Sequence, residues 1–206
     1  MNESQNRGDT EMLQWFLIFL CAIEVCVGFE KLDPKYQVGY GDPNSSIKVV
    51  EYFSLSCAKC FEFFQEDFQG IRRKYLDTGE ISWSFHPDPA DLLTLQAMVC
   101  LENLPNEVKK RLFLETVLKH IQEKKFKHGC LIMQAAMEVL GIPLPDLAEI
   151  EFLEKTQAFK EAYLFLKQKD VVKTIPMLEI NGRLRAEYPS KAFLEKEVAV
   201  LRKENP

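Results

Sequence analysis

Two cysteines, Cys57 and Cys60, stand where a predicted strand passes into a predicted helix. The apolar run of residues 47–53 before them is typical of a buried strand. Apolar side chains at helical spacing follow at Phe61, Phe64, Phe68 and Ile71. A thiol at a helix N-terminus faces unpaired N–H groups and the positive end of the helix dipole, which both favour the thiolate. Because two thiols at this spacing can close and reopen a disulfide, the junction predicts thiol–disulfide exchange, with Cys57 as nucleophile and Cys60 as resolving thiol.

The composition narrows the protein class further. A chain of 206 residues fits one domain, or one domain with an insertion. The hydrophobic share of 47% is large enough for a real core, and the net charge of −5 gives no electrostatic case for a nucleic-acid partner. Six cysteines are too few, at this length, for a scaffold held together by disulfides.

The N-terminal segment predicts export. Residues 12–23 form a nearly unbroken apolar run, whose length suits the hydrophobic region of a secretory signal and is short for a membrane span. Acidic residues outnumber basic ones before this run, which is unlike a signal peptide unless translation begins at Met12. We therefore expect residues 1–28 to be a signal peptide or an N-terminal anchor, with Gly28 as a plausible cleavage point. The alternative is a hydrophobic helix packed on a cytosolic protein.

The first half of the remaining chain reads as strands around the cysteine helix. Residues 36–40 predict an edge strand, and the cysteine helix runs to about residue 76. Residues 81–85 alternate between apolar and polar side chains, which predicts a second strand, and residues 86–89 break it.

A helical block then interrupts the strand pattern. Residues 90–169 read as about four helices, with breaks at 104–106, 127–129 and 141–145. Such a block inside an α/β pattern predicts an inserted subdomain. The expected parts are a first core segment at 29–87, the insertion at 88–155 and a second core segment at 156–206.

The strand pattern returns near the C-terminus. Residues 177–180 predict a strand, Asn181-Gly182 a hairpin turn, and residues 183–186 the strand that pairs back. A final helix is expected from Pro189 or Ser190 to about residue 203.

Three stretches in this order resemble the DsbA-like branch of the thioredoxin superfamily, a group of disulfide oxidoreductases of the bacterial envelope. Residues 50–60, VEYFSLSCAKC, resemble its strand and thiol segment, and residues 174–183, TIPMLEINGR, are similar to its cis-proline strand and hairpin. The helical block lies between them. The resemblance covers about residues 36–203 and implies an α/β thioredoxin fold with an inserted helical subdomain.

The resemblance also implies roles for residues around the cysteines. Glu51 matches a buried acid that passes a proton to or from Cys60 during exchange; the alternative is that Glu51 faces solvent. Pro176 matches a cis proline that packs against the dithiol, and the alternative is a trans proline at a strand start. The backbone of Ile175 is then expected to pair with a substrate peptide as an added strand.

Three positions depart from the family pattern and bear on the direction of exchange. Ala58 stands where a proline is common, Lys59 where a histidine or aromatic residue is common, and Ile175 is more similar to the residue of cytosolic thioredoxin. These positions tune the redox potential. Lys59 either places a positive charge beside Cys57, where substrate binds, or points into water.

The remaining cysteines predict no further chemistry. Cys100 lies among apolar residues and reads as a buried thiol, and Cys130 reads similarly at the start of an apolar helix. A Cys100–Cys130 disulfide is the alternative. A zinc site at the motif would need two more ligands, and the candidates Cys100, Cys130 and His128 are too scattered. We expect no metal and no organic cofactor.

These expectations combine into one predicted function. We expect an exported enzyme of the bacterial periplasm that exchanges disulfides with cysteine-containing envelope proteins, acting as a disulfide donor. A membrane redox partner would either reoxidise the pair, as a quinone-linked oxidase, or supply electrons to it, as a reductase. The alternatives are an envelope disulfide reductase or isomerase and, in another class, a non-catalytic holdase that binds peptides.

Overall fold

The computed structural model describes residues 34–88, 91–124, 128–145, 157, 160–161, 174–185 and 188–204. All of them belong to one unit of the chain, which comprises residues 31–206. The predicted signal segment at 1–28 and most of the predicted fourth helix lie outside the described residues. The expected domain boundaries therefore stay predictions.

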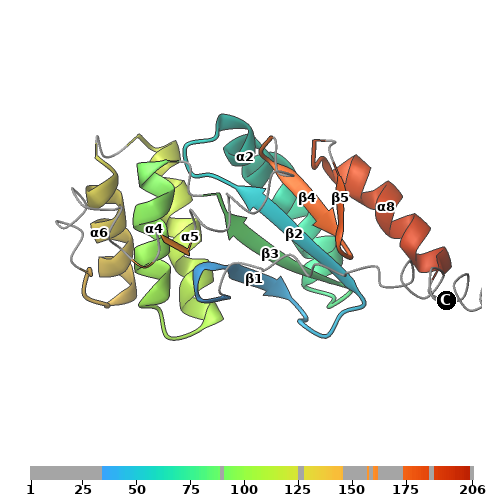
Figure 1. The fold of residues 1–206 in the computed structure, drawn as a ribbon, viewed down its shortest axis with the longest axis horizontal. Coiled ribbons are helices and arrows are strands. Elements are labelled where there is room, and N and C mark those ends of the chain that lie inside the picture. Colours follow the sequence, from blue (N-terminus) through green and yellow to red (C-terminus); the bar gives the residue numbers. More distant parts are fainter. Residues whose placement is uncertain are drawn as a thin grey trace, which may run out of the picture. The chain divides into compact units, whose positions relative to one another are not determined.

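A five-stranded mixed sheet forms the centre of the fold, in the order β1-β3-β2-β4-β5 (Figure 1). Its strands are β1 (Val38–Gly41), β2 (Ile47–Phe53), β3 (Ile81–Pro87), β4 (Met177–Ile180) and β5 (Arg183–Arg185). β2 pairs with β3 in parallel and with β4 in antiparallel orientation, whereas β1 and β5 form antiparallel edges. β2 is the middle strand and is hydrogen-bonded to β3 on one side and to β4 on the other. The cysteine motif therefore follows directly from the strand that is held on both edges.

The cysteine helix ends where the sequence predicts, but its geometry changes along its length. It consists of α2 (Ala58–Phe63), η2 (Phe64–Phe68), α3 (Gln69–Ile71) and η3 (Arg72–Leu76), of which η2 and η3 are π-helical. At its end the backbone N–H of Asp77 donates to Arg72 O at 2.9 Å, and Gly79 takes a positive φ of 75°. The spacing of apolar residues predicts a helix here but does not predict that two of its turns are π-helical.

Aromatic side chains fill the space between this helix and the sheet. Phe63, Phe64 and Phe68 are buried, as the helical spacing predicts. The ring centroid of Phe68 lies 4.9 Å from that of Phe85 and 5.7 Å from that of Trp83, both on β3. Edge-to-face contacts of this kind add to the burial of large apolar surfaces, so this cluster fixes the helix on the sheet.

Three helices form the described part of the insertion, and Figure 1 shows them grouped together beside the sheet. They are α4 (Leu92–Glu102), α5 (Glu107–Gln122) and α6 (Gly129–Leu140), with the predicted breaks between them. α5 covers the edge strand β1, where Glu107 Oε2 accepts from Gly39 N at 2.7 Å and Arg111 Nε donates to Gly39 O. The insertion thus satisfies backbone groups that an edge strand would otherwise expose.

The C-terminal hairpin and helix agree with the sequence. Asn181 and Gly182 have φ values of 47° and 80°, which a two-residue hairpin turn of this kind needs. The Asn181 side chain also accepts from Lys48 N at 2.7 Å, which ties the turn to β2. Helix α8 (Lys191–Glu204) follows Ser190, whose hydroxyl accepts from Phe193 N at 3.2 Å.

Three details differ from the sequence expectations. The segment Pro34–Tyr36 forms the 3-10 turn η1, so the edge strand begins only at Val38. β3 continues to Pro87, because its last two residues pair with the last two of β2 in the parallel register. Cys130 is exposed, so the expectation that it is a buried thiol is wrong. Cys100 is buried as predicted, and both thiols are free.

Candidate functional site

Cys57 caps the N-terminus of α2 with its sulfur. Its backbone is extended, with φ −85° and ψ 111°, and its Sγ accepts a hydrogen bond from Cys60 N at 3.2 Å. The sulfur thus satisfies one of the backbone N–H groups that are otherwise unpaired at the start of a helix. Cys57 is half-buried and Cys60 buried, and both are free thiols, so the structure shows the dithiol form. Of the two thiols of the motif, only Cys57 is accessible to a partner molecule.

The segment before β4 lies against the Cys57 sulfur. The peptide bond between Ile175 and Pro176 is cis, as the resemblance implied. The Cys57 thiol donates to Ile175 O at 3.7 Å, although the two residues are 118 positions apart in sequence. Pro176 is buried and Ile175 half-buried. A backbone that reaches the surface beside a reactive sulfur is well placed to contact the chain that carries the attacking thiol.

Glu51 is a buried acid in the middle strand. It is 1% exposed and lies on β2 between Phe85 of β3 and Leu178 of β4, which excludes the alternative of a solvent-facing side chain. Burial raises the pKa of the Glu51 carboxyl well above 4.5, and the charge of Cys57 raises this pKa further. The indole of Trp83 opposes the shift in pKa, but neither carboxyl oxygen has a hydrogen-bond partner of normal geometry among the described residues. Glu51 is therefore held in its protonated form.

Cys60 faces the same interior. It is 4% exposed, and burial raises the pKa of its thiol strongly; its hydrogen bond with Cys57 raises the pKa further. A thiol that resists ionisation in this way needs a nearby proton acceptor before it can attack as thiolate.

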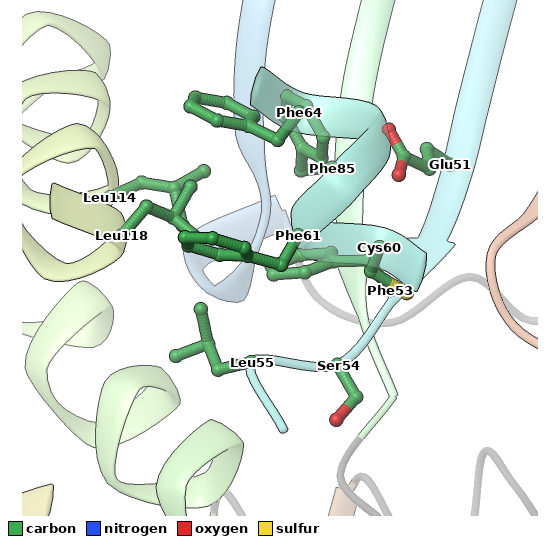
Figure 2. Close-up of a pocket in the computed structure, with 10 residues that line it drawn as sticks. All are labelled: Glu51, Phe53, Ser54, Leu55, Cys60, Phe61, Phe64, Phe85, Leu114 and Leu118. Atoms are coloured by element: carbon green, nitrogen blue, oxygen red, sulfur yellow. The ribbon is translucent and has the colours of Figure 1, made fainter. Parts of the chain in front are cut away.

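Both residues line one small cavity (Figure 2). Its volume is about 10 Å³, which is room for about one water molecule, and both Glu51 and Cys60 line it. Figure 2 shows Leu114 and Leu118 reaching from α5 toward the phenyl rings of Phe61 and Phe64, which close the cavity with apolar side chains. Glu51 and Cys60 therefore border one water-sized space inside the protein.

Lys59 lies on the exposed surface of α2. Its side chain makes no hydrogen bond or ion pair with another residue in the described ranges. Its role in substrate binding stays a prediction.

The sequence reasoning missed two residues beside the motif. Asp91 and Thr94, at the start of α4, bond to the turn that precedes Cys57. The signal was present, because an aspartate directly before an apolar helical run is a typical N-cap. Nothing in that pattern, however, indicates that the cap also faces the cysteine motif.

Two kinds of feature are absent from the described residues. No group of three His, Cys, Asp or Glu side chains is placed to hold a metal ion there. No helix in this part of the chain combines the length and the hydropathy that a membrane span requires.

Comparisons with known proteins agree with this geometry. A family model described as thioredoxin matches residues 33–198. A Rickettsia typhi protein named as a protein-disulfide oxidoreductase is 40% identical over 43 residues, which is 21% of this chain but only 16% of that relative.

Solved structures match over a greater length. Chlamydia trachomatis DsbA superimposes with a TM-score of 0.61 at 20% identity, over 81% of this chain and 92% of that one. Wolbachia pipientis alpha-DsbA1 gives a TM-score of 0.64 at 20% identity, over 82% and 92% of the two chains. The predicted α/β thioredoxin fold with an inserted helical subdomain is confirmed.

Proposed function

Because this chain belongs to the thioredoxin family, we propose that it is a protein thiol–disulfide oxidoreductase whose redox pair is Cys57 and Cys60. One observation carries the proposal. The accessible Cys57 sulfur caps α2 and touches the segment before β4, while the buried Cys60 lies one helical turn further in, beside a buried acid. This arrangement supports Cys57 as the attacking sulfur, Cys60 as the resolving sulfur and Glu51 as the proton carrier.

In the donor direction, a substrate thiolate attacks Sγ of Cys57 in the oxidised pair. A sulfur–sulfur bond forms between substrate and Cys57, and the bond to Cys60 breaks. Cys60 leaves as a thiolate and takes a proton, because burial raises its pKa. Glu51, which burial keeps protonated, supplies this proton across the shared cavity.

A second substrate thiolate completes the exchange. It attacks the substrate sulfur of the mixed disulfide, and Cys57 leaves as a thiolate. The Cys60 N–H and the N-terminus of α2 stabilise this leaving group. The substrate has lost two electrons and the Cys57–Cys60 pair has gained them. Stabilising the reduced pair makes its disulfide more oxidising, which supports the donor direction.

The substrates that fit this site are extended polypeptides that contain cysteine. The half-buried backbone at Ile175 lies beside Cys57, where a substrate segment can pair with it as an added strand. We further propose that the substrates are envelope proteins, that the protein works in the periplasm, and that a membrane redox partner returns the pair to its disulfide. These three points rest on the resemblance to the DsbA-like group.

The reduction potential of the Cys57–Cys60 pair tests the proposal. The full chain is equilibrated with glutathione buffers, and the fraction of dithiol is measured by alkylation and mass spectrometry. A reduction potential of about −120 mV supports a disulfide donor, whereas a reduction potential of about −270 mV makes the protein a reductase.

Two variants separate the enzyme from a non-catalytic holdase. Cys57→Ser should abolish exchange with a reduced unfolded protein, whereas Cys130→Ser, which removes an exposed thiol outside the motif, should leave exchange unchanged. If no Cys57–Cys60 disulfide forms at any potential while Cys57→Ser still binds unfolded chains, the oxidoreductase proposal is wrong and the holdase is favoured.

A further inference from the structure

The turn between β2 and α2 is bonded to the first residue before α4. This turn comprises residues 54–56 and leads directly into Cys57. Ser56 Oγ donates to Asp91 Oδ1 at 2.8 Å, and Ser54 Oγ donates to Asp91 Oδ2. One carboxylate of the insertion therefore accepts from both serine hydroxyls of the turn that presents the accessible cysteine.

The same carboxylate also caps α4. Asp91 Oδ1 accepts from Thr94 N at 2.9 Å, and Oδ2 accepts from Thr94 Oγ1 at 2.7 Å. The Thr94 hydroxyl is wholly buried and in turn accepts from Leu55 N at 2.9 Å. Each carboxylate oxygen is thus shared between the helix cap and the turn, so that neither can move without the other.

Every backbone N–H from Leu55 to Cys57 has an acceptor in this arrangement. Leu55 N donates to Thr94 Oγ1, Ser56 N donates to Ser54 Oγ at 3.1 Å, and Cys57 N donates to Ser54 O at 3.2 Å. The first two of these acceptors are hydroxyls that themselves donate to the carboxylate of Asp91. The position of the Cys57 backbone therefore depends on a side chain of the insertion.

We propose that Asp91 is a positioning residue for the redox pair, which holds the turn at residues 54–56 against α4 and so keeps the Cys57 sulfur at the N-terminus of α2. The inference rests on the proposed function for its biological meaning. It assigns the helical insertion a part in the chemistry, since the insertion supplies the acceptor that orders the approach to Cys57. Asp91 acts through the turn and touches neither sulfur in the described contacts.

The expected consequence is a less firmly positioned Cys57 sulfur when Asp91 is changed. In Asp91→Asn the amide oxygen still caps α4, because asparagine is as good an N-cap as aspartate. The amide nitrogen cannot accept from a hydroxyl, so the single acceptor that the Ser54 and Thr94 hydroxyls share, Oδ2, is lost. We expect Cys57 to move away from the Cys60 N–H for part of the time and to react about 10-fold more slowly with iodoacetamide at pH 7.

Asn106 provides a matched control for the loss of a cap. It caps α5 by accepting from Lys109 N at 3.0 Å and contacts no residue of the cysteine motif. Asp91→Ala and Asn106→Ala each remove one N-cap acceptor from the insertion. Both should lower the midpoint of urea unfolding, but only Asp91→Ala should also slow the alkylation of Cys57 in the folded dithiol form.

The assay is site-resolved alkylation of the full-length chain, followed by mass spectrometry, with the reduction potential as second readout. Slower alkylation of Cys57 in Asp91→Asn, with Asn106→Ala like the wild type, supports the inference. Equal rates in all three proteins overturn it. A faster rate in Asp91→Asn also overturns it, because the negative charge of Asp91 would then govern Cys57 rather than its hydrogen bonds.

This test is independent of the proposed function. Alkylation of Cys57 requires no disulfide, so the role of Asp91 is decided even if the pair proves inactive in exchange. A wild type that exchanges disulfides while Asp91→Asn matches it in alkylation and potential refutes the positioning role alone. If Asp91→Ala fails to fold, Asp91→Asn keeps the helix cap and gives the answer by itself.

Discussion

Replacing Glu51 by glutamine should make the stability of the protein less sensitive to pH. Glu51 is 1% exposed, and burial raises the pKa of its carboxyl well above 4.5 in the folded protein. In the unfolded chain the same carboxyl loses its proton near the ordinary value. Above that value the unfolded state therefore binds fewer protons than the folded state, and the free energy of unfolding falls as the pH rises.

The size of the effect follows from the single proton involved. Between the pKa of Glu51 in the unfolded chain and its raised pKa in the folded protein lies a pH window. Across this window the free energy of unfolding of the wild type falls by about 1.4 kcal/mol per pH unit relative to a variant without the carboxyl. The window opens near 4.5 and closes where the folded carboxyl finally ionises. While Glu51 stays protonated in the folded protein, the free energy of unfolding of Glu51→Gln should rise by about 2 kcal/mol relative to that of the wild type between about pH 5.0 and 6.5. Ionisable groups that do not interact with Glu51 cancel in this difference.

Urea unfolding at several pH values measures this difference, with a reductant present so that both proteins stay in the dithiol form. Glu66→Gln is a suitable control, because this exposed side chain on η2 is solvated whether or not the chain is folded. Its stability curve should run parallel to that of the wild type. A Glu51→Gln curve that is also parallel to the wild type would falsify the reasoning, since Glu51 would then ionise in the folded protein as readily as in water.

Three further predictions concern the rest of the fold. Iodoacetamide should label the exposed Cys130 in the native protein and label Cys100 only after unfolding, because burial raises the pKa of Cys100 to about 12. Peptide mass spectrometry measures both labelling rates, and rapid labelling of Cys100 in the native protein would contradict its burial. Phe68→Ala should lower the free energy of unfolding by about 3–5 kcal/mol in urea titrations, since the ring is fully buried among other aromatic rings; a loss below about 1 kcal/mol would mean that the cluster repacks. Gly182→Ala should cost about 1 kcal/mol in the same titration, because the residue has a φ of +80°, and an unchanged midpoint would count against the strain at this turn.

Local patterns predicted most of the fold. The apolar run before Cys57, the helical spacing after it and the Asn181-Gly182 turn each specify an element through interactions within a few residues. For the same reason the breaks between the insertion helices were found where turn-forming residues cluster. The π-helical turns of η2 and η3 were not predicted, because apolar spacing distinguishes a helix from a strand but does not distinguish a π-helical turn from an α-helical one.

The burial of single residues was harder to predict. The apolar surroundings of Cys130 in sequence suggested a buried thiol, but a helix has an outer face even when many of its residues are apolar, and Cys130 lies on it. Glu51 presented the opposite problem, since strand alternation allows either face. Its burial between β3 and β4 settles the question.

The sequence by itself predicted the redox pair, because two thiols at the start of a helix need only local backbone geometry to be able to form a disulfide. It also determined, through the hydrophobic pattern, which segments become strands and helices. The tertiary structure alone decided what surrounds the pair: Glu51 beneath Cys60, Ile175 beside Cys57, and Asp91 bonded to the turn. These contacts join residues that are far apart in the chain, and no local pattern specifies which side chains meet when the sheet closes.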